Sequence, residues 1–413
     1  MAGIYIHIPF CRSRCIYCGF YSTTALELRQ RYVDALCREM EIRGTGHLIS
    51  GHSPNQGPVP PISPPISTIY LGGGTPSQLS FDQLNQLFIY INKVYDLVSP
   101  SEITIEVNPD DVTGEFAAAL KQFPINRVSM GIQTFNDQRL RFLRRRHTAQ
   151  QAIDAVERLR AAGISNLSID LMYGFPDETL ADWEADIESA LALNVEHISA
   201  YCLMIEEGTS LHKMFTVDSL SSCVPAVASG KAERTDDYSG NQHNENCPQC
   251  VDEETERQMY YTLIDRLTAA GYEHYEISNF ARPGFRSRHN SNYWNGTPYI
   301  GLGAAAHSYD VRSRSWNVAD INAYIEGIEQ GERRYEEELL DDDTRYNDTI
   351  TVGLRTCEGI SLGTLSKKHK DYCIKNARRY LDDGLLEIVD QHLRLTRSGL
   401  FVSDMVMSDL MMV

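Results

Sequence analysis

The sequence predicts an α/β protein whose first half is an open or closed (β/α) barrel. Apolar runs suited to strands alternate six times with segments of helical periodicity, which implies a parallel sheet with right-handed crossovers. No GxGxxG follows the first strand, so the pattern favours a barrel over a dinucleotide-binding fold. At roughly 150 residues per domain, 413 residues allow two to three domains.

The first domain is predicted to span residues 1–212. Its strands are expected at 4–8, 68–71, 102–107, 127–131, 166–171 and 197–204. Its helices are expected at 26–42, 81–95, 115–123, 149–162 and 180–193. The stretch 50–67 is rich in Gly, Ser and Pro, and because proline lacks an amide donor and fixes φ, we expect a surface loop there.

Three further regions follow. Residues 213–252 are polar with few large apolar side chains, which predicts a mobile or loosely packed insertion. Residues 253–335 extend the barrel and begin with a helix over 254–270 that Gly271 ends. Residues 336–413 form a C-terminal domain after an acidic linker at 336–338 and 341–343. Two helices and two short strands around Asp390 and Gln391 resemble a winged helix.

The charge balance opposes nucleic acid as a partner. Acidic residues outnumber basic ones by 56 to 38, for a net charge of −18, and the winged-helix-like region has no dense basic stripe. No run approaches the roughly 18 to 20 apolar residues that cross a bilayer, and the N-terminus opens on a strand-like GIYIHIPF. We expect a cytoplasmic protein that is not an integral membrane protein.

Three cysteines stand directly after the first strand as CxxxCxxC, at Cys11, Cys15 and Cys18. Three thiolates on a tight loop can hold three irons of a [4Fe-4S] cluster, which leaves the fourth iron for the amino and carboxylate groups of a substrate. The alternatives are a zinc site, for which His7 is the only close histidine, or three buried cysteines.

Polar groups and glycines also follow the next strands. Gly73, Gly74 and Thr75 end the second strand, and Glu106, Gln133 and Asp170 end the third, fourth and fifth. The carboxyl ends of barrel strands share one rim, where glycines admit a ligand to the backbone and the polar side chains accept from ribose hydroxyls or an ammonium.

The motifs YIHIPFCRSRCIYC, YLGGGTP, EVNPD, SMGIQTFND and DLMYGFP resemble radical S-adenosylmethionine (SAM) proteins, and among them the oxygen-independent coproporphyrinogen III oxidase group. The resemblance implies a (β/α)6 partial barrel of the TIM type, with a [4Fe-4S] cluster on the three cysteines. It implies SAM contacts from Tyr5, Tyr17, Gly73, Gly74, Thr75, Glu106, Gln133, Arg145, Asp170 and Met204.

Two features separate branches of this group. The true oxidases read CxxxCxxCxC and carry an N-terminal extension, whereas this chain has Phe20 at the position of the fourth cysteine and only a short stretch before Tyr5. The segment from His289 to Trp294 matches the HNxxYW pattern of the haem chaperone HemW family. Gly19 departs from that family, where Asp is commoner.

An imidazole, an amide, a phenol and an indole within six residues can flank a flat aromatic ligand and ligate its metal. We therefore predict haem contacts from His289, Asn290, Tyr293 and Trp294, with His289 as the favoured iron ligand and His7 as its rival. The alternative is an ordinary loop with a buried Trp and a hydrogen-bonded His.

Two weaker patterns remain. Cys247 and Cys250 form half a zinc site, with His243 and Cys223 as conceivable ligands, although a lone CxxC in a polar insertion is more often incidental. The run 144–147 (RRRH) is usual for a solvated face. The resemblance places Arg145 on SAM, and its neighbours are expected to meet porphyrin carboxylates.

The favoured function is therefore a haem chaperone that binds haem as cargo, a [4Fe-4S] cluster and SAM. It would pass haem to an acceptor such as a respiratory haemoprotein, with transient contact with membrane respiratory proteins. The alternative is a coproporphyrinogen III oxidase, which Phe20 and HNxxYW disfavour. A winged-helix regulator with a redox-sensing cluster is disfavoured by the acidic balance.

Overall fold

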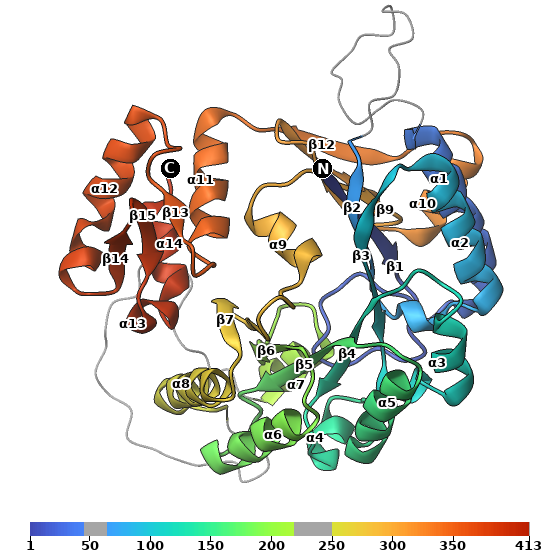
Figure 1. Cartoon of the computed structure of the whole chain (residues 1–413), viewed down its shortest axis with the longest axis horizontal. Helices are drawn as coiled ribbons and strands as arrows, with labels where there is room; N and C mark the ends of the chain where they lie inside the picture. The colour runs from blue at the N-terminus through green and yellow to red at the C-terminus, as the bar shows by residue number, and fades with distance from the viewer. Residues whose placement is uncertain (45–63, 219–249, 413) are drawn as a thin grey trace, which may run out of the picture.

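A computed structural model describes residues 1–44, 64–218 and 250–412, and within them a single sheet contains twelve strands (Figure 1). Its order is β12-β11-β10-β9-β1-β2-β3-β4-β5-β6-β8-β7, so the described sheet is open rather than closed on itself. Six consecutive strands at its centre are parallel, as predicted: β1 (Ala2–Ile8), β2 (Ile66–Gly73), β3 (Leu97–Val107), β4 (Arg127–Gln133), β5 (Asn166–Tyr173) and β6 (His197–Cys202).

Helices connect these strands and cover the outer side of the sheet (Figure 1). Capping boxes start three of them, at Ser80, Thr148 and Thr179, where a hydroxyl accepts from the third helical amide. The five predicted helices are confirmed as α1 (Arg29–Gly44), α2 (Phe81–Val94), α3 (Gly114–Leu120), α5 (Ala149–Ala161) and α6 (Leu180–Ala192). The short helix α4 (Asp137–Phe142) and the 3-10 turns at Leu26–Leu28, Pro76–Gln78 and Pro109–Asp111 were not predicted.

Short strands that the sequence analysis missed extend both edges of the sheet. On one edge β9 (Tyr299–Leu302) pairs in parallel with β1, and three antiparallel strands follow it. On the other edge, β8 pairs with β6 and with β7. These strands are β10 (His307–Tyr309), β11 (Ser313–Asn317), β12 (Tyr335–Leu339), β7 (Glu273–Glu276) and β8 (Asn279–Ala281). The helix predicted over 254–270 is confirmed as α8 (Glu253–Ala269). The other helices of this region are α7 (Ser210–Asp218), α9 (Arg288–Trp294) and α10 (Ile321–Glu329).

Four predicted boundaries are corrected. The acidic residues 336–338 are not a linker, because they belong to the exposed edge strand β12, and Asp341 then caps the next helix through the amide of Thr344. Strand β2 begins at Ile66, inside the stretch predicted as a loop, and α7 continues to Asp218, inside the predicted insertion. Strand β6 ends at Cys202 instead of residue 204. The rest of both stretches, 50–63 and 219–249, lies outside the described residues.

The C-terminal region has a hydrophobic core of its own, which includes Ile350, Cys373, Leu393 and Val406. Its hairpin turns at Asp390 and Gln391, as predicted, and both residues have positive φ, as a type I′ turn requires. Its elements are α11 (Asp342–Gly353), β13 (Ile360–Ser361), α12 (Lys367–Asp382), β14 (Leu386–Val389), β15 (His392–Leu395), α13 (Arg397–Leu400) and α14 (Ser403–Leu410).

This C-terminal region is attached near both edges of the large sheet. Beside β7, the amide of Ile277 donates to the carbonyl of Arg355 at 3.0 Å, and that of Cys357 donates to Tyr275 at 3.1 Å. Near the opposite edge, Arg314 of β11 pairs with Asp348 of α11 at 3.1 Å. The C-terminal region therefore spans the open side of the partial barrel (Figure 1).

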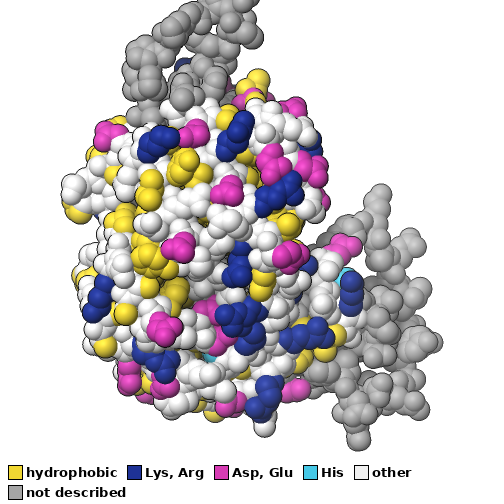
Figure 2. Space-filling model, turned by 90° about the vertical axis from the view of Figure 1, so that its right-hand side faces the viewer, with side chains coloured by type: hydrophobic (Ala, Val, Ile, Leu, Met, Phe, Trp, Pro, Cys, Tyr) yellow, Lys and Arg dark blue, Asp and Glu magenta, His cyan; other side chains and the backbone are white. Residues whose placement is uncertain are grey.

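On the face that lies to the right in Figure 1, basic, acidic and hydrophobic side chains are interspersed (Figure 2). No helix in the described part of the chain is long and apolar enough to cross a membrane.

Candidate cofactor site

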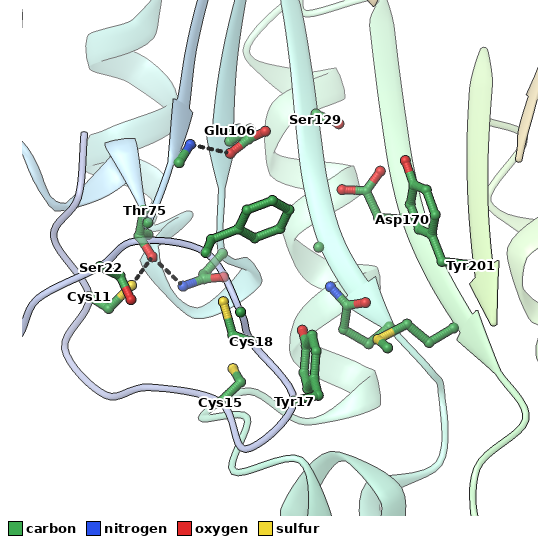
Figure 3. Close-up of a pocket in the computed structure, with 18 of the residues that line it drawn as sticks. Cys11, Cys15, Tyr17, Cys18, Ser22, Thr75, Glu106, Ser129, Asp170 and Tyr201 are labelled. Carbon is green, nitrogen blue, oxygen red and sulfur yellow. Dashed lines mark hydrogen bonds between the residues drawn. The ribbon is translucent and has the colours of Figure 1, made fainter. Parts of the chain in front are cut away.

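The cysteine loop follows β1, and backbone hydrogen bonds join its two ends. The amide of Cys11 donates to Thr23 at 2.9 Å, and the amide of Thr23 donates to Pro9 at 2.7 Å. At the far end of the loop, Ile16 is buried in a small apolar cluster that also contains Phe175. These anchors hold the loop against the carboxyl ends of the strands, with its cysteines beside the cavity (Figure 3).

Cys11, Cys15 and Cys18 are free, partly buried thiols that line one cavity of about 610 Å³. Burial raises the pKa of the Cys11 and Cys18 thiols, so iron would stabilise thiolates that burial alone disfavours. In the described residues, no three His, Cys, Asp or Glu side chains are placed to hold one metal ion, which does not support zinc here. Three thiols around a shared cavity fit a cluster, because each thiolate binds a different iron.

The strand ends bring two carboxyl groups into the same cavity. Tyr70 donates to Glu106 at 2.8 Å, and the amide of Gly73 donates to the other carboxylate oxygen at 3.0 Å. Burial raises the pKa of Glu106 to about 7 and that of Asp170 to about 6. Arg127, which is 1% exposed, lowers both pKa values by its charge without cancelling the effect of burial. Both carboxyls can therefore accept hydrogen bonds from a polar ligand near neutral pH.

Arg145 joins the cysteine loop to the strand ends. Its guanidinium donates to the Cys15 sulfur at 3.7 Å, to the Asn108 side chain at 2.8 Å and to the carbonyl of Gly131 at 2.5 Å. Asn108 in turn donates to Thr75, whose hydroxyl lies 3.6 Å from the Cys11 sulfur. The cation is therefore fixed beside the Cys15 sulfur and linked through Asn108 and Thr75 to that of Cys11, where a ligand carboxylate would benefit from its charge.

Most residues predicted to contact SAM meet at this cavity. Its lining includes Tyr17, Gly73, Gly74, Thr75, Glu106, Gln133, Arg145, Asp170 and Met204. Tyr5 does not, because its hydroxyl turns to His7 at 3.0 Å and its side chain lines a second cavity. The cavity also has lining residues that were not predicted from the sequence, namely Tyr70, Asn108, Arg127, Ser129, Ser199 and Tyr201. Ser129 and Tyr201 are labelled in Figure 3. Alternation along the strands was the available signal, since Ser199 and Tyr201 lie two apart on β6, and Arg127 and Ser129 two apart on β4.

The HNxxYW segment forms α9, and its side chains divide between the two cavities. Asn290 lines the first, whereas Tyr293 and Trp294 line the second. His289 is 1% exposed, and its two ring nitrogens lie 2.9 Å from the hydroxyls of Thr68 and of Tyr293. Both ring nitrogens of His289 therefore have hydrogen-bond partners, which makes the alternative of a buried, hydrogen-bonded histidine the simpler interpretation.

Other predicted positions have ordinary partners. Arg146 pairs with Asp110 at 2.6 Å and Asp111 at 3.1 Å, so its charge is not held for a porphyrin. His147 is buried and bonds the carbonyl of Ile132, while Arg144 is exposed. Of the CxxC pair only Cys250 is described. Cys223, His243 and Cys247 lie outside the described residues.

Gly19, which follows the third cysteine, packs closely against the side chain of Glu206. A Cβ atom at this position would collide with the carboxylate of Glu206, a residue that also lines the first cavity. The Glu206 carboxylate, which comes from the segment after β6, therefore occupies the space that a side chain at position 19 would take.

The radical SAM superfamily matches residues 5–190, and the HemN C-terminal domain matches residues 340–402. The chain is 34% identical to the heme chaperone HemW of Bacillus subtilis over 89% of this chain and 87% of that protein. It is 31% identical to HemW of Lactococcus lactis over 94% and 89% of the two chains. Among solved structures, coproporphyrinogen III oxidase (HemN) of Escherichia coli matches 99% of this chain and 89% of that one, with a TM-score of 0.76 and 20% identity, which shows the shared fold.

The cavity places three cysteines opposite the polar strand ends, and the similarity to HemW proteins extends over nearly the whole chain. The chain therefore belongs to the HemW family of radical SAM proteins.

Proposed function

We propose that this protein is a haem chaperone that holds a [4Fe-4S] cluster and SAM in the first cavity, binds haem and delivers it to a haemoprotein. The observation that carries the proposal is the set of three free thiols facing Glu106, Gln133 and Asp170 across one cavity. Its relatives carry the name heme chaperone. We expect the protein to work in the cytoplasm, with transient contact with membrane respiratory proteins during delivery.

The residues of the cavity have distinct roles in this proposal. Cys11, Cys15 and Cys18 hold three irons, while Arg145 fixes a carboxylate beside them. Glu106, Gln133 and Asp170 accept hydrogen bonds from hydroxyl and ammonium groups of SAM. When bound, the cluster would supply one iron open to the amino and carboxylate groups of SAM and an electron for its reductive cleavage.

Iron and sulfide analysis tests the cofactor assignment. Protein reconstituted without oxygen should contain about four irons and four sulfides per chain. Replacing Cys11, Cys15 and Cys18 by Ala should abolish the brown chromophore, whereas Cys357→Ala, at an exposed cysteine on the C-terminal region, should retain it. A triple variant that keeps its chromophore, or a wild type that binds a single zinc, would contradict the assignment.

Haem transfer tests the delivery step. When the haem-loaded protein is mixed with an apo-haemoprotein, the Soret spectrum of the acceptor should appear at the expense of the donor's. The rate should exceed that of free haem released from serum albumin at the same concentration. Transfer no faster than from albumin would leave haem binding intact and contradict delivery.

The second candidate function is oxidation of coproporphyrinogen III. The fold it shares with the Escherichia coli oxidase favours it. Phe20 opposes it, because this exposed side chain replaces the fourth cysteine of the oxidase pattern. Turnover of coproporphyrinogen III by the reconstituted protein separates the two functions.

A further inference from the structure

A second cavity, of about 930 Å³, lies between the sheet and the C-terminal region. Its walls come from β1, the end of α9, β9 and β10 on one side and from α11 and β13 on the other. Its volume lies within the usual range of about 300 to 1,000 Å³ for ligand pockets. Gly19 and Phe20 of the cysteine loop line both cavities, so the second cavity adjoins the cofactor site without being part of it.

The lining of this second cavity is aromatic. Tyr293 meets Tyr299 edge to face, with ring centroids 4.7 Å apart, and Tyr299 lies 6.1 Å from Tyr309. Trp294 also lines it, and its buried indole N–H has no hydrogen-bond partner in the described structure. The guanidinium of Arg355 lies 4.9 Å from the centre of the Trp294 ring. Rings held in this way offer flat, apolar surfaces to a planar aromatic ligand.

Two histidines line the cavity, and only one of them has free ring nitrogens. His7 is 5% exposed, and its nitrogens lie 3.0 Å from the Tyr5 hydroxyl and 3.0 Å from the carbonyl of Tyr21. The ring of His307, on β10, is partly exposed, makes no hydrogen bond in the described structure and stacks on Trp316 with centroids 5.7 Å apart. The partial burial of this ring lowers its pKa, which favours the neutral imidazole that can ligate a metal.

Two guanidinium groups lie at the same cavity. Arg314 pairs with Glu338 at 3.0 Å and Asp348 at 3.1 Å, and Arg345 pairs with Asp342. Both arginine side chains are about one third or more exposed, so solvent weakens these pairs. Arginine also carries more donors than these contacts use, which leaves N–H groups for carboxylates of a ligand.

We infer that haem binds in this second cavity with its iron ligated by His307. The inference rests on the proposed function, because it assumes that the chain binds haem, and it gives that haem a place and an iron ligand. Tyr299, Tyr309 and Trp294 contact the macrocycle, and Arg314 and Arg345 receive the propionates. The first cavity remains free for the cluster and SAM, with Phe20 between the two sites.

A comparison of two porphyrins tests the iron ligand in the full reconstituted chain. Haem and metal-free protoporphyrin IX are titrated into the wild type and into His307→Ala. The variant should shift the Soret band and bind haem at least about ten-fold more weakly, while its affinity for protoporphyrin stays within about two-fold of the wild type. His392→Ala, at a histidine of the C-terminal hairpin, is the matched control and should behave as the wild type.

An unchanged Soret band and haem affinity in His307→Ala, or loss of binding of both porphyrins to this variant, overturns His307 as the ligand. A loss of haem binding that is confined to His7→Ala, titrated in the same way, also overturns it. A wild type that binds no haem instead overturns the proposed function itself.

A second variant tests the cavity independently of the ligand. Val352 of α11 lines it and is only partly buried, so Val352→Trp should fill the space without unfolding the chain. Binding of both porphyrins should fall, while thermal unfolding and the cluster chromophore stay unchanged. Undiminished binding of both porphyrins to this variant would overturn the second cavity as the haem site.

Discussion

At the scale of single residues, the buried carboxyl of Glu106 couples ionisation to folding. Its pKa in the folded chain is about 7, above that of an exposed carboxyl, because burial disfavours the charged form. The folded state therefore binds the proton more tightly than the unfolded state, and stability falls as pH rises from the ordinary carboxyl pKa to about 7 and then levels off.

We predict that Glu106→Gln removes this part of the pH dependence. At pH 8 the ligand-free variant should be more stable than the wild type, by about 3 kcal/mol at most, since each pKa unit corresponds to about 1.4 kcal/mol. At pH 4, where the wild-type carboxyl is protonated in both states, the difference should be small. Urea unfolding at the two pH values measures this, and equal differences at both would contradict the burial of a titrating carboxyl.

SAM binding depends on three acceptors at the strand ends. Glu106→Ala, Gln133→Ala and Asp170→Ala should each weaken SAM by about ten-fold, since each removes a hydrogen-bond partner worth about 1 to 2 kcal/mol. Isothermal titration of the anaerobically reconstituted variants measures the affinity. The cluster absorption is the internal control and should be retained, because none of the three replaces a thiol. Unchanged SAM affinity in all three variants would exclude this rim as the binding surface.

Helix α9 lies between the two cavities and is anchored by one buried side chain, that of His289. His289 stacks on Tyr70 at 5.1 Å and bonds Thr68, and its backbone amide donates to Glu102 at 2.9 Å. We predict that His289→Ala lowers the free energy of unfolding by about 2 to 4 kcal/mol, because it opens a cavity and leaves buried hydroxyls unpartnered. Tyr293→Phe, which keeps the ring, should cost only about 1 kcal/mol.

Urea denaturation gives both values. The Soret band of haem bound to folded His289→Ala should match that of the wild type. A shifted band with unchanged stability would restore His289 as an iron ligand and contradict its structural role.

The helices and strands differ in how far the sequence predicts them. The six βα units were predictable because their strands are long and apolar and their helices begin with capping residues such as Ser80 and Thr148. The outer strands were not, since β10 has three residues and every side chain of β12 is exposed, which leaves little hydropathy pattern.

The cofactor site was predictable from the spacing of its cysteines and from residues at strand ends. The contacts of the HNxxYW side chains were harder to predict, because a motif places His289 in a segment without showing which ring nitrogens are bonded. Likewise, the positive φ of Gln133, which ends β4 beside the cavity, has no sequence signal of the kind a glycine would give.

At the scale of the whole molecule, the open barrel and the C-terminal region together form the two adjoining cavities. The C-terminal region contacts β7 through Ile277 and Arg355 and contacts β11 through Arg314 and Asp348, so the second cavity exists only when this region is docked. The two cavities, which we propose as the cofactor site and the haem site, share Gly19 and Phe20.

We expect this chain to carry haem and not to make porphyrin. One preparation, reconstituted without oxygen, reduced and supplied with SAM, is divided between a haem titration and an assay of coproporphyrinogen III decarboxylation. The protein should bind about one haem per chain, since one cavity has a free imidazole, and should give no decarboxylated product. Sustained coproporphyrinogen turnover, or the absence of saturable haem binding, would contradict this expectation.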